Sequence, residues 1–100
     1  MNLEFIYSKR VDKFLSKNSH LLDKVTVRKL LIKAVRKIIL REDVNIDIKK
    51  LKGELNHLHR IRQNKIRILF EIKDNEIIIQ LFVEDIDFRG NLLKNVVFNS

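Results

Sequence analysis

The stretch LHRIRQNKIRILFEI, residues 58–72, decides the fold of this chain because its pattern predicts a β-hairpin. Residues 65–73 alternate between an apolar and a largely charged face, as a half-buried strand does. The apolar face comprises Ile66, Ile68, Phe70 and Ile72, and the other comprises Lys65, Arg67, Leu69 and Glu71. HLHRIR, residues 57–62, is predicted to be the partner strand.

The segments around this hairpin predict one α+β domain over residues 1–100. Residues 2–8 alternate like a half-buried strand, and residues 9–18 carry a short apolar stripe that predicts a helix. The clearest helix spans residues 22–41, and its stripe comprises Val27, Leu31, Ala34, Val35 and Ile38. We expect both helices to pack on one face of an antiparallel sheet of about four strands.

Two other segments complete this expected order. Residues 41–56 are polar and irregular, so no strand is predicted there. Asp74 and Asn75 predict a turn, and residues 76–86 follow as an apolar strand. Because that strand is apolar on both faces at its start, we expect it to lie in the middle of the sheet.

The composition limits the possible chemistry and location. The chain has no cysteine, which excludes disulfides and thiolate metal sites. No run approaches the roughly 18 apolar residues that span a bilayer, and the first ten residues do not resemble a signal peptide. We therefore expect a cytoplasmic protein without a membrane partner.

Positive charge concentrates in and just before the hairpin. The net charge is +8, and residues 49–67 hold seven Lys/Arg against one Asp/Glu. Residues 68–100 hold three Lys/Arg against six Asp/Glu. This pattern is typical of a polyanion-binding protein, and nucleic acid is the leading partner. A generally basic composition is the alternative, because lysine is frequent throughout.

Strand parity predicts where the hairpin arginines meet. Arg60 and Arg62 share one face of the first strand, and Arg67 lies on the charged face of the second. We expect the three to converge on the sheet face opposite the helices, with Arg89 closing the patch. Guanidinium groups bind phosphate oxygens in pairs, so the cluster predicts a phosphate site. The alternative is a solvated basic face that pairs with Glu71, Glu84 and Asp85.

His57 and His59 are two residues apart, so both are expected on the same face of the predicted strand. Two imidazoles are too few for a metal site, and no third ligand is evident, so no metal is expected. A general acid or base is possible at His59, because histidine titrates near neutral pH. The alternative is a polar strand residue without a role.

The pattern KKLKGELNHLHRIRQNKIRILFEIKDNEIIIQLFVEDIDFRG, residues 49–90, resembles the RelE branch of the RelE/ParE toxin superfamily. In that branch a KLKG run precedes strands similar to LYRLR and YRIIYEI, an acidic turn, a hydrophobic strand and a terminal HR step. The opening FIYSKRVDKFLSK, residues 5–17, resembles its EFSKRAEKFLKK start. The order and spacing of these motifs extend over nearly the whole chain.

This resemblance implies a ribosome-dependent mRNA endonuclease that enters the ribosomal A site and inhibits translation. The 2′-hydroxyl of the RNA attacks the adjacent phosphate, and no metal or other cofactor takes part. By their positions in the motif, the resemblance implies that Arg67 and Arg89 bind the scissile phosphate. It implies that Arg60 and Arg62 bind RNA or bias proton transfer. His59 stands where the family often has tyrosine, and it is the candidate base.

The resemblance also implies contacts with the nucleic-acid backbone. The candidate binding residues are Lys50, Lys52, Lys65 and Phe88. Leu93 stands where the family often has a base-stacking tyrosine, so Phe88, just before Arg89, is the candidate aromatic platform.

The implied partners are the ribosome with its mRNA and a cognate antitoxin, which is acidic and partly disordered before it binds. Two other functions remain open from the sequence. One is a ParE-like inhibitor of DNA gyrase, and the other is a degenerate, non-catalytic toxin that acts as a binding module.

Overall fold

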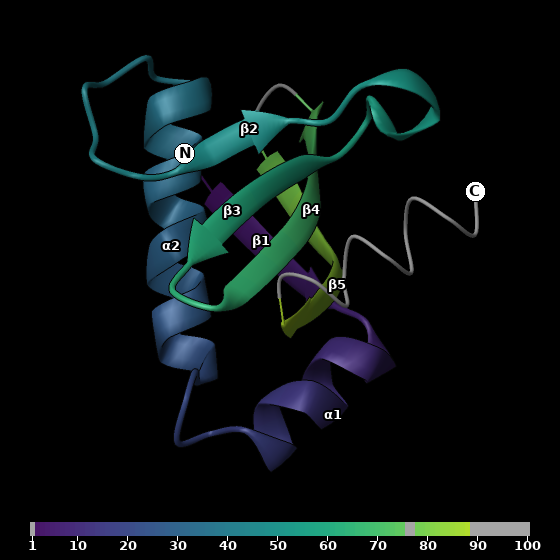
Figure 1. The fold of residues 1–100 in the computed structure, drawn as a ribbon. Helices are drawn as coiled ribbons and strands as arrows, with labels where there is room; N and C mark the ends of the chain where they lie inside the picture. The colour runs from purple at the N-terminus through teal and green to yellow at the C-terminus, as the bar shows by residue number, and fades with distance from the viewer. Residues whose placement is uncertain (1, 76–77, 89–100) are drawn as a thin grey trace.

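The computed structural model describes residues 2–75 and 78–88, with side chains described for residues 2–73 (Figure 1). The elements are β1 (Asn2–Tyr7), α1 (Lys9–Lys17), α2 (Lys24–Ile38), β2 (Ile48–Lys50), the 3-10 helix η1 (Gly53–Leu55), β3 (His59–Gln63), β4 (Ile66–Asn75) and β5 (Ile78–Phe88). The strands form one sheet in the order β1-β5-β4-β3-β2. The predicted α+β class is therefore confirmed. Across the described ranges, no helix has the length and apolar character needed to cross a membrane.

The sheet differs from the predicted one in its edges. It has five strands, because β2 forms in the segment expected to be irregular and pairs antiparallel with β3. At the other edge, β1 pairs parallel with β5, so the sheet is mixed. β4 also continues through Asp74 and Asn75, where a turn was predicted. Three paired residues in β2 are too few to show an alternating pattern in the sequence.

The helix bounds follow from local capping. Ser8 accepts a hydrogen bond from the Val11 amide at 3.2 Å and caps α1. Asp23 accepts one from the Thr26 amide at 2.8 Å and caps α2, which lowers the pKa of Asp23. Helix α2 is therefore shorter at its start than the predicted span from residue 22.

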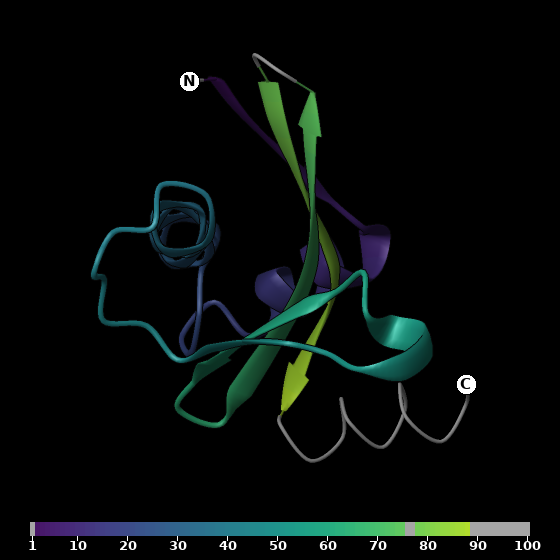
Figure 2. The ribbon, with the colours of Figure 1, turned by 90° about the horizontal axis from the view of Figure 1, so that it is seen from above.

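Both helices bury their apolar stripes against one face of the sheet, as predicted. The buried residues of this main core are Val11, Leu15, Leu22, Val27, Leu30, Leu31, Ala34, Val35, Ile61, Ile66, Ile68 and Phe70. Figure 2 shows α2 end-on at one side of the sheet and η1 at the other. The second face is therefore not simply open. Leu58 and Leu69 are buried there, with Leu51 and Leu55 packed against them.

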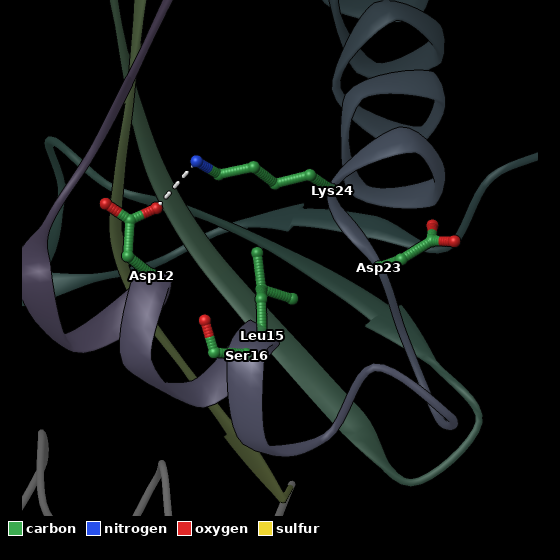
Figure 3. Close-up of a pocket in the computed structure, with 5 residues that line it drawn as sticks. All are labelled: Asp12, Leu15, Ser16, Asp23 and Lys24. Atoms are coloured by element: carbon green, nitrogen blue, oxygen red, sulfur yellow. Dashed lines mark ion pairs between the residues drawn. The ribbon is translucent and has the colours of Figure 1, made fainter.

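An ion pair joins the two helices where α2 begins (Figure 3). Lys24 Nζ lies 2.8 Å from Asp12 Oδ1 of α1, beside a hollow of about 320 Å³. A cation in the first turn of a helix meets the positive end of the helix dipole, which is unfavourable. Asp12 offsets that charge, and its hydrogen bond raises the pKa of Lys24. We regard this hollow as part of the scaffold.

Candidate functional site

Three arginines of the hairpin converge on one hollow of about 270 Å³, which we call the arginine hollow. Its lining residues are Lys49, Lys50, Leu51, Lys52, Arg60, Arg62 and Arg67. The structure thus brings together three of the four arginines that the sequence grouped, and Lys50 and Lys52 with them.

The register of the hairpin explains this convergence. Arg62 lies directly opposite Arg67, and Arg60 lies opposite Leu69, so all four side chains share one face. Leu69 belongs to the second apolar cluster, which identifies that face as the one opposite the helices. The tight connection between β3 and β4 is made at Asn64, whose φ of 54° is a conformation that asparagine tolerates well.

Two of the three guanidinium groups are more buried than a solvated basic face allows. Arg60 and Arg67 are each 6% exposed, whereas the Arg62 side chain is 37% exposed. Arg62 and Arg67 lie directly opposite each other, and two like charges in that position of a sheet repel. An anion that enters this hollow would reduce that repulsion. Guanidinium forks suit phosphate oxygens, because they present several N–H donors and keep their charge.

Asp47 supplies a carboxylate that the sequence reasoning missed. Its Oδ1 lies 3.3 Å from Arg60 Nη1, and its Oδ2 lies 3.9 Å from Arg62 Nε. The Arg62 amide also donates a hydrogen bond to the Asp47 carbonyl at 3.0 Å. Asp47 directly precedes β2, so its placement depends on a strand that was not predicted.

Lys49 was missed for the same reason. The β2–β3 register puts Lys49 opposite Arg60 and Lys50 opposite His59. Lys49 therefore shares the face of the arginines, although only Lys50 and Lys52 were singled out from the sequence. Asp47 and Lys49 thus border the hollow because β2 pairs with β3, whereas the side chain of Lys50 lies on the face of His59.

The two histidines do not join the arginine hollow. His59 stacks on Phe70 of the main core, with ring centroids 5.6 Å apart, so it lies on the opposite face of β3 from Arg60. Burial lowers the pKa of His59, and the charge of Lys50 lowers it further. His57 is exposed in the turn before β3, so the expectation that both histidines share one strand face is wrong.

The remaining predicted residues lie elsewhere or outside the described part. Lys65 is exposed and lines a separate hollow of about 330 Å³ with Leu21 and Leu22. The backbone of Phe88 ends β5 opposite Ile66. The side chain of Phe88, and all of Arg89 and Leu93, lie outside the described residues. Within the described ranges, no three histidine, cysteine or acidic side chains gather as ligands for a metal ion.

Comparisons with known proteins identify the fold. No protein-family model matches the chain, and no curated protein matches it in sequence. Among solved structures, YafQ from E. coli matches with a TM-score of 0.62 at 12% identity, over 91% of this chain and 98% of that one. A YoeB/ParE toxin from Agrobacterium tumefaciens matches with a TM-score of 0.56 at 12% identity, over 86% of this chain and 98% of that one. The RelE–RelB complex from Pyrococcus horikoshii matches with a TM-score of 0.53 at 22% identity, over 90% of this chain and 98% of that one. This chain therefore has the fold of the RelE/ParE toxins, as its sequence resemblance predicted.

Proposed function

We propose that this protein is the toxin of a type II toxin–antitoxin pair and cleaves mRNA on the ribosome. The observation that carries the proposal is the convergence of Arg60, Arg62 and Arg67 on one hollow. The hollow lies in a fold shared with proteins named as toxins. Three guanidinium groups, with Lys49 and Lys52 beside them, fit a phosphodiester and its neighbours along an RNA strand.

The chemistry requires the hollow to stabilise extra negative charge. The 2′-hydroxyl releases its proton to solvent water as its oxygen forms a bond to phosphorus, and the bond from phosphorus to the 5′-oxygen breaks. The 5′-oxygen takes up a proton, which leaves a 2′,3′-cyclic phosphate and a free 5′-hydroxyl. The phosphorane that forms carries one more negative charge than the substrate, and the nearby guanidinium groups favour it over the ground state. Arginine does not give up its proton at neutral pH, so its role is electrostatic. A lysine ammonium at the rim is the group there that can protonate the leaving oxygen.

His59 is not included in this mechanism. Its ring stacks on Phe70, on the other face of β3 from the arginine hollow. A side chain there does not reach a phosphate bound on the arginine face, because neighbouring strand residues point in opposite directions.

An antitoxin is the second proposed partner. The structural match from P. horikoshii is itself a RelE–RelB complex. A net charge of +8 favours an acidic partner, which would neutralise the chain and block its access to RNA.

A cell-free translation reaction tests the proposal directly. We expect the purified protein to produce mRNA 5′ ends at the A-site codon, mapped by primer extension, only when ribosomes are present. If supercoiling by DNA gyrase falls while mRNA stays intact, the protein acts as the ParE-like inhibitor instead. No effect in either reaction contradicts both activities and favours a non-catalytic binding module.

Variants of the hollow make the test specific. We expect Arg67→Gln to lower the cleavage rate about 100-fold or more, the usual effect of removing one donor that stabilises an oxyanion. Glutamine is preferable to alanine here, because Arg67 is buried and truncation would leave a cavity. Lys33→Gln removes an equal charge from an exposed position on α2 and is the matched control. Equal loss in both variants would contradict a specific role for Arg67.

A further inference from the structure

We infer that Asp47 determines the specificity of the arginine hollow by competing with RNA phosphates for Arg60 and Arg62. In the free protein its carboxylate neutralises part of the hollow, and a phosphate must displace it to bind both arginines. RNA that is not presented by the ribosome therefore binds weakly. The inference rests on the proposed RNA substrate, but it concerns binding and does not require cleavage.

The position of Asp47 supports this role. Its two carboxylate oxygens face different arginines, at 3.3 Å from Arg60 Nη1 and 3.9 Å from Arg62 Nε. A phosphate offers the same arrangement of two anionic oxygens to two guanidinium groups. The main chain of Asp47 is fixed by its hydrogen bond from the Arg62 amide, so the carboxylate stays near the hollow in the free protein.

The strength of the contact suits displacement. The Asp47 side chain is 55% exposed, and ion pairs of exposed carboxylates are weak. Arg60 is nearly buried and gains from a strong anion partner. A phosphate already positioned by other contacts can therefore replace the carboxylate. A freely diffusing RNA strand must overcome the repulsion from Asp47 without that help.

Glu42 provides a matched control within the same chain. It pairs with Arg36, its side chain is 44% exposed, and neither residue lines the arginine hollow. Glu42→Gln and Asp47→Asn change the net charge equally. If the two variants differ in RNA affinity, the difference is therefore due to the position of the removed carboxylate and not to the change in net charge.

The experiment measures binding of a single-stranded 2′-O-methyl RNA oligonucleotide, which cannot be cleaved by 2′-hydroxyl attack. We expect Asp47→Asn to bind at low salt about threefold or more tightly than Glu42→Gln, the effect of one unit charge about 6 Å from a phosphate in water. The salt dependence should also steepen, because more phosphate contacts release more counterions. Asp47→Glu keeps the charge and should bind as the wild type does.

The outcomes separate this inference from the proposed function. If Asp47→Asn binds no more tightly than Glu42→Gln, the inference is wrong, while ribosome-dependent cleavage can still stand. If the affinity rises but no ribosome-dependent cuts occur, the inference stands and the proposed cleavage fails. If neither the wild type nor a variant binds at low salt, both fail. Asp47→Ser serves as a second neutral variant if Asp47→Asn does not fold.

Discussion

A single step along β3 separates two ionisable side chains with opposite surroundings. Arg60 lies in the arginine hollow beside Asp47, and His59 lies against Phe70 on the other face. Successive side chains of a strand point to opposite faces of the sheet. Basic residues that are adjacent in the sequence therefore lie in two different environments in the fold. The step from residue 59 to residue 60 therefore decides which side chain can meet a phosphate.

His59 leads to a prediction at the same scale. Burial and Lys50 lower its pKa in the folded state, so the unfolded chain binds the proton more readily. Stability is then complete above the unfolded pKa of about 6.5 and falls as the pH drops below it toward the folded pKa. We expect the unfolding free energy, measured by urea titration, to decrease as the pH falls over that range. In His59→Phe the unfolding free energy should change less with pH than in the wild type.

His57→Gln is the control for this titration, because His57 is exposed and lies outside the strand. This variant removes one imidazole without changing β3, so it controls for the loss of a histidine as such. A wild type whose stability is constant from pH 7 to pH 5 would contradict the assignment of a half-buried, neutral His59.

At the scale of elements, the loop between β2 and β3 holds one side of the arginine hollow. The Leu51 amide donates to the Leu58 carbonyl at 3.0 Å, and both side chains join the small apolar cluster around Leu69. Gly53 opens η1 with a φ of 71°, a conformation that glycine adopts without strain. The loop therefore carries Lys52 to the hollow by packing on the face away from the helices.

This cluster can be tested by truncation. We expect Leu58→Ala to lower the unfolding free energy by about 2–5 kcal/mol, because the side chain is buried and leaves a cavity. Hydrogen exchange of the loop amides should accelerate, and RNA affinity should fall as Lys52 loses its support. Leu40→Ala at an exposed site should change stability by no more than about 0.5 kcal/mol. Unchanged loop exchange in Leu58→Ala would show that the cluster does not hold the loop.

At the scale of the whole molecule, positive charge opposes folding in the absence of an anion. The chain carries +8, and Arg62 and Arg67 lie directly opposite each other in the hairpin. Anything that binds the folded hollow and not the unfolded chain stabilises the protein by mass action. The stability of this protein should therefore depend on the anion present as well as on ionic strength.

We expect inorganic polyphosphate to raise the thermal midpoint more than sodium chloride at equal ionic strength. At 100 times its dissociation constant, a specific ligand adds about 2.7 kcal/mol to the unfolding free energy. Polyphosphate should raise the thermal midpoint of Arg62→Gln less than that of the wild type. It should raise the midpoint of Lys33→Gln nearly as much as that of the wild type. An equal gain in both variants would mean that the stabilisation comes from net charge and not from the arginine hollow.

The predicted architecture was correct where the sequence pattern was long. The stripe of α2 and the alternation of β4 each repeat over several turns or pleats, and the structure buries the residues they indicated, such as Leu31 and Ile68. The prediction that Arg60, Arg62 and Arg67 lie together was also correct. It needed only the alternation of side chains along each strand and the pairing of two adjacent strands, which are local properties. The roles of these arginines in catalysis remain predictions.

The errors fell where the pattern was short or where pairing was distant. Strand β2 is three residues long, and only its pairing with β3 brings Asp47 and Lys49 to the hollow. The parallel pairing of β1 with β5 joins residues 76 positions apart in the chain, such as Asn2 and Ile78, and neither strand encodes its partner locally. His59 was grouped with the arginines although parity already placed it on the other face.

The sequence by itself determined the helices, the hairpin and the face on which its arginines lie, because periodicity and turn chemistry act over a few residues. Tertiary structure alone decided the fifth strand, the position of Asp47 between two guanidinium groups and the burial of Arg60 and Arg67. These features depend on contacts between residues far apart in the chain. Such contacts form only when the loss of chain entropy is offset by packing of the whole domain.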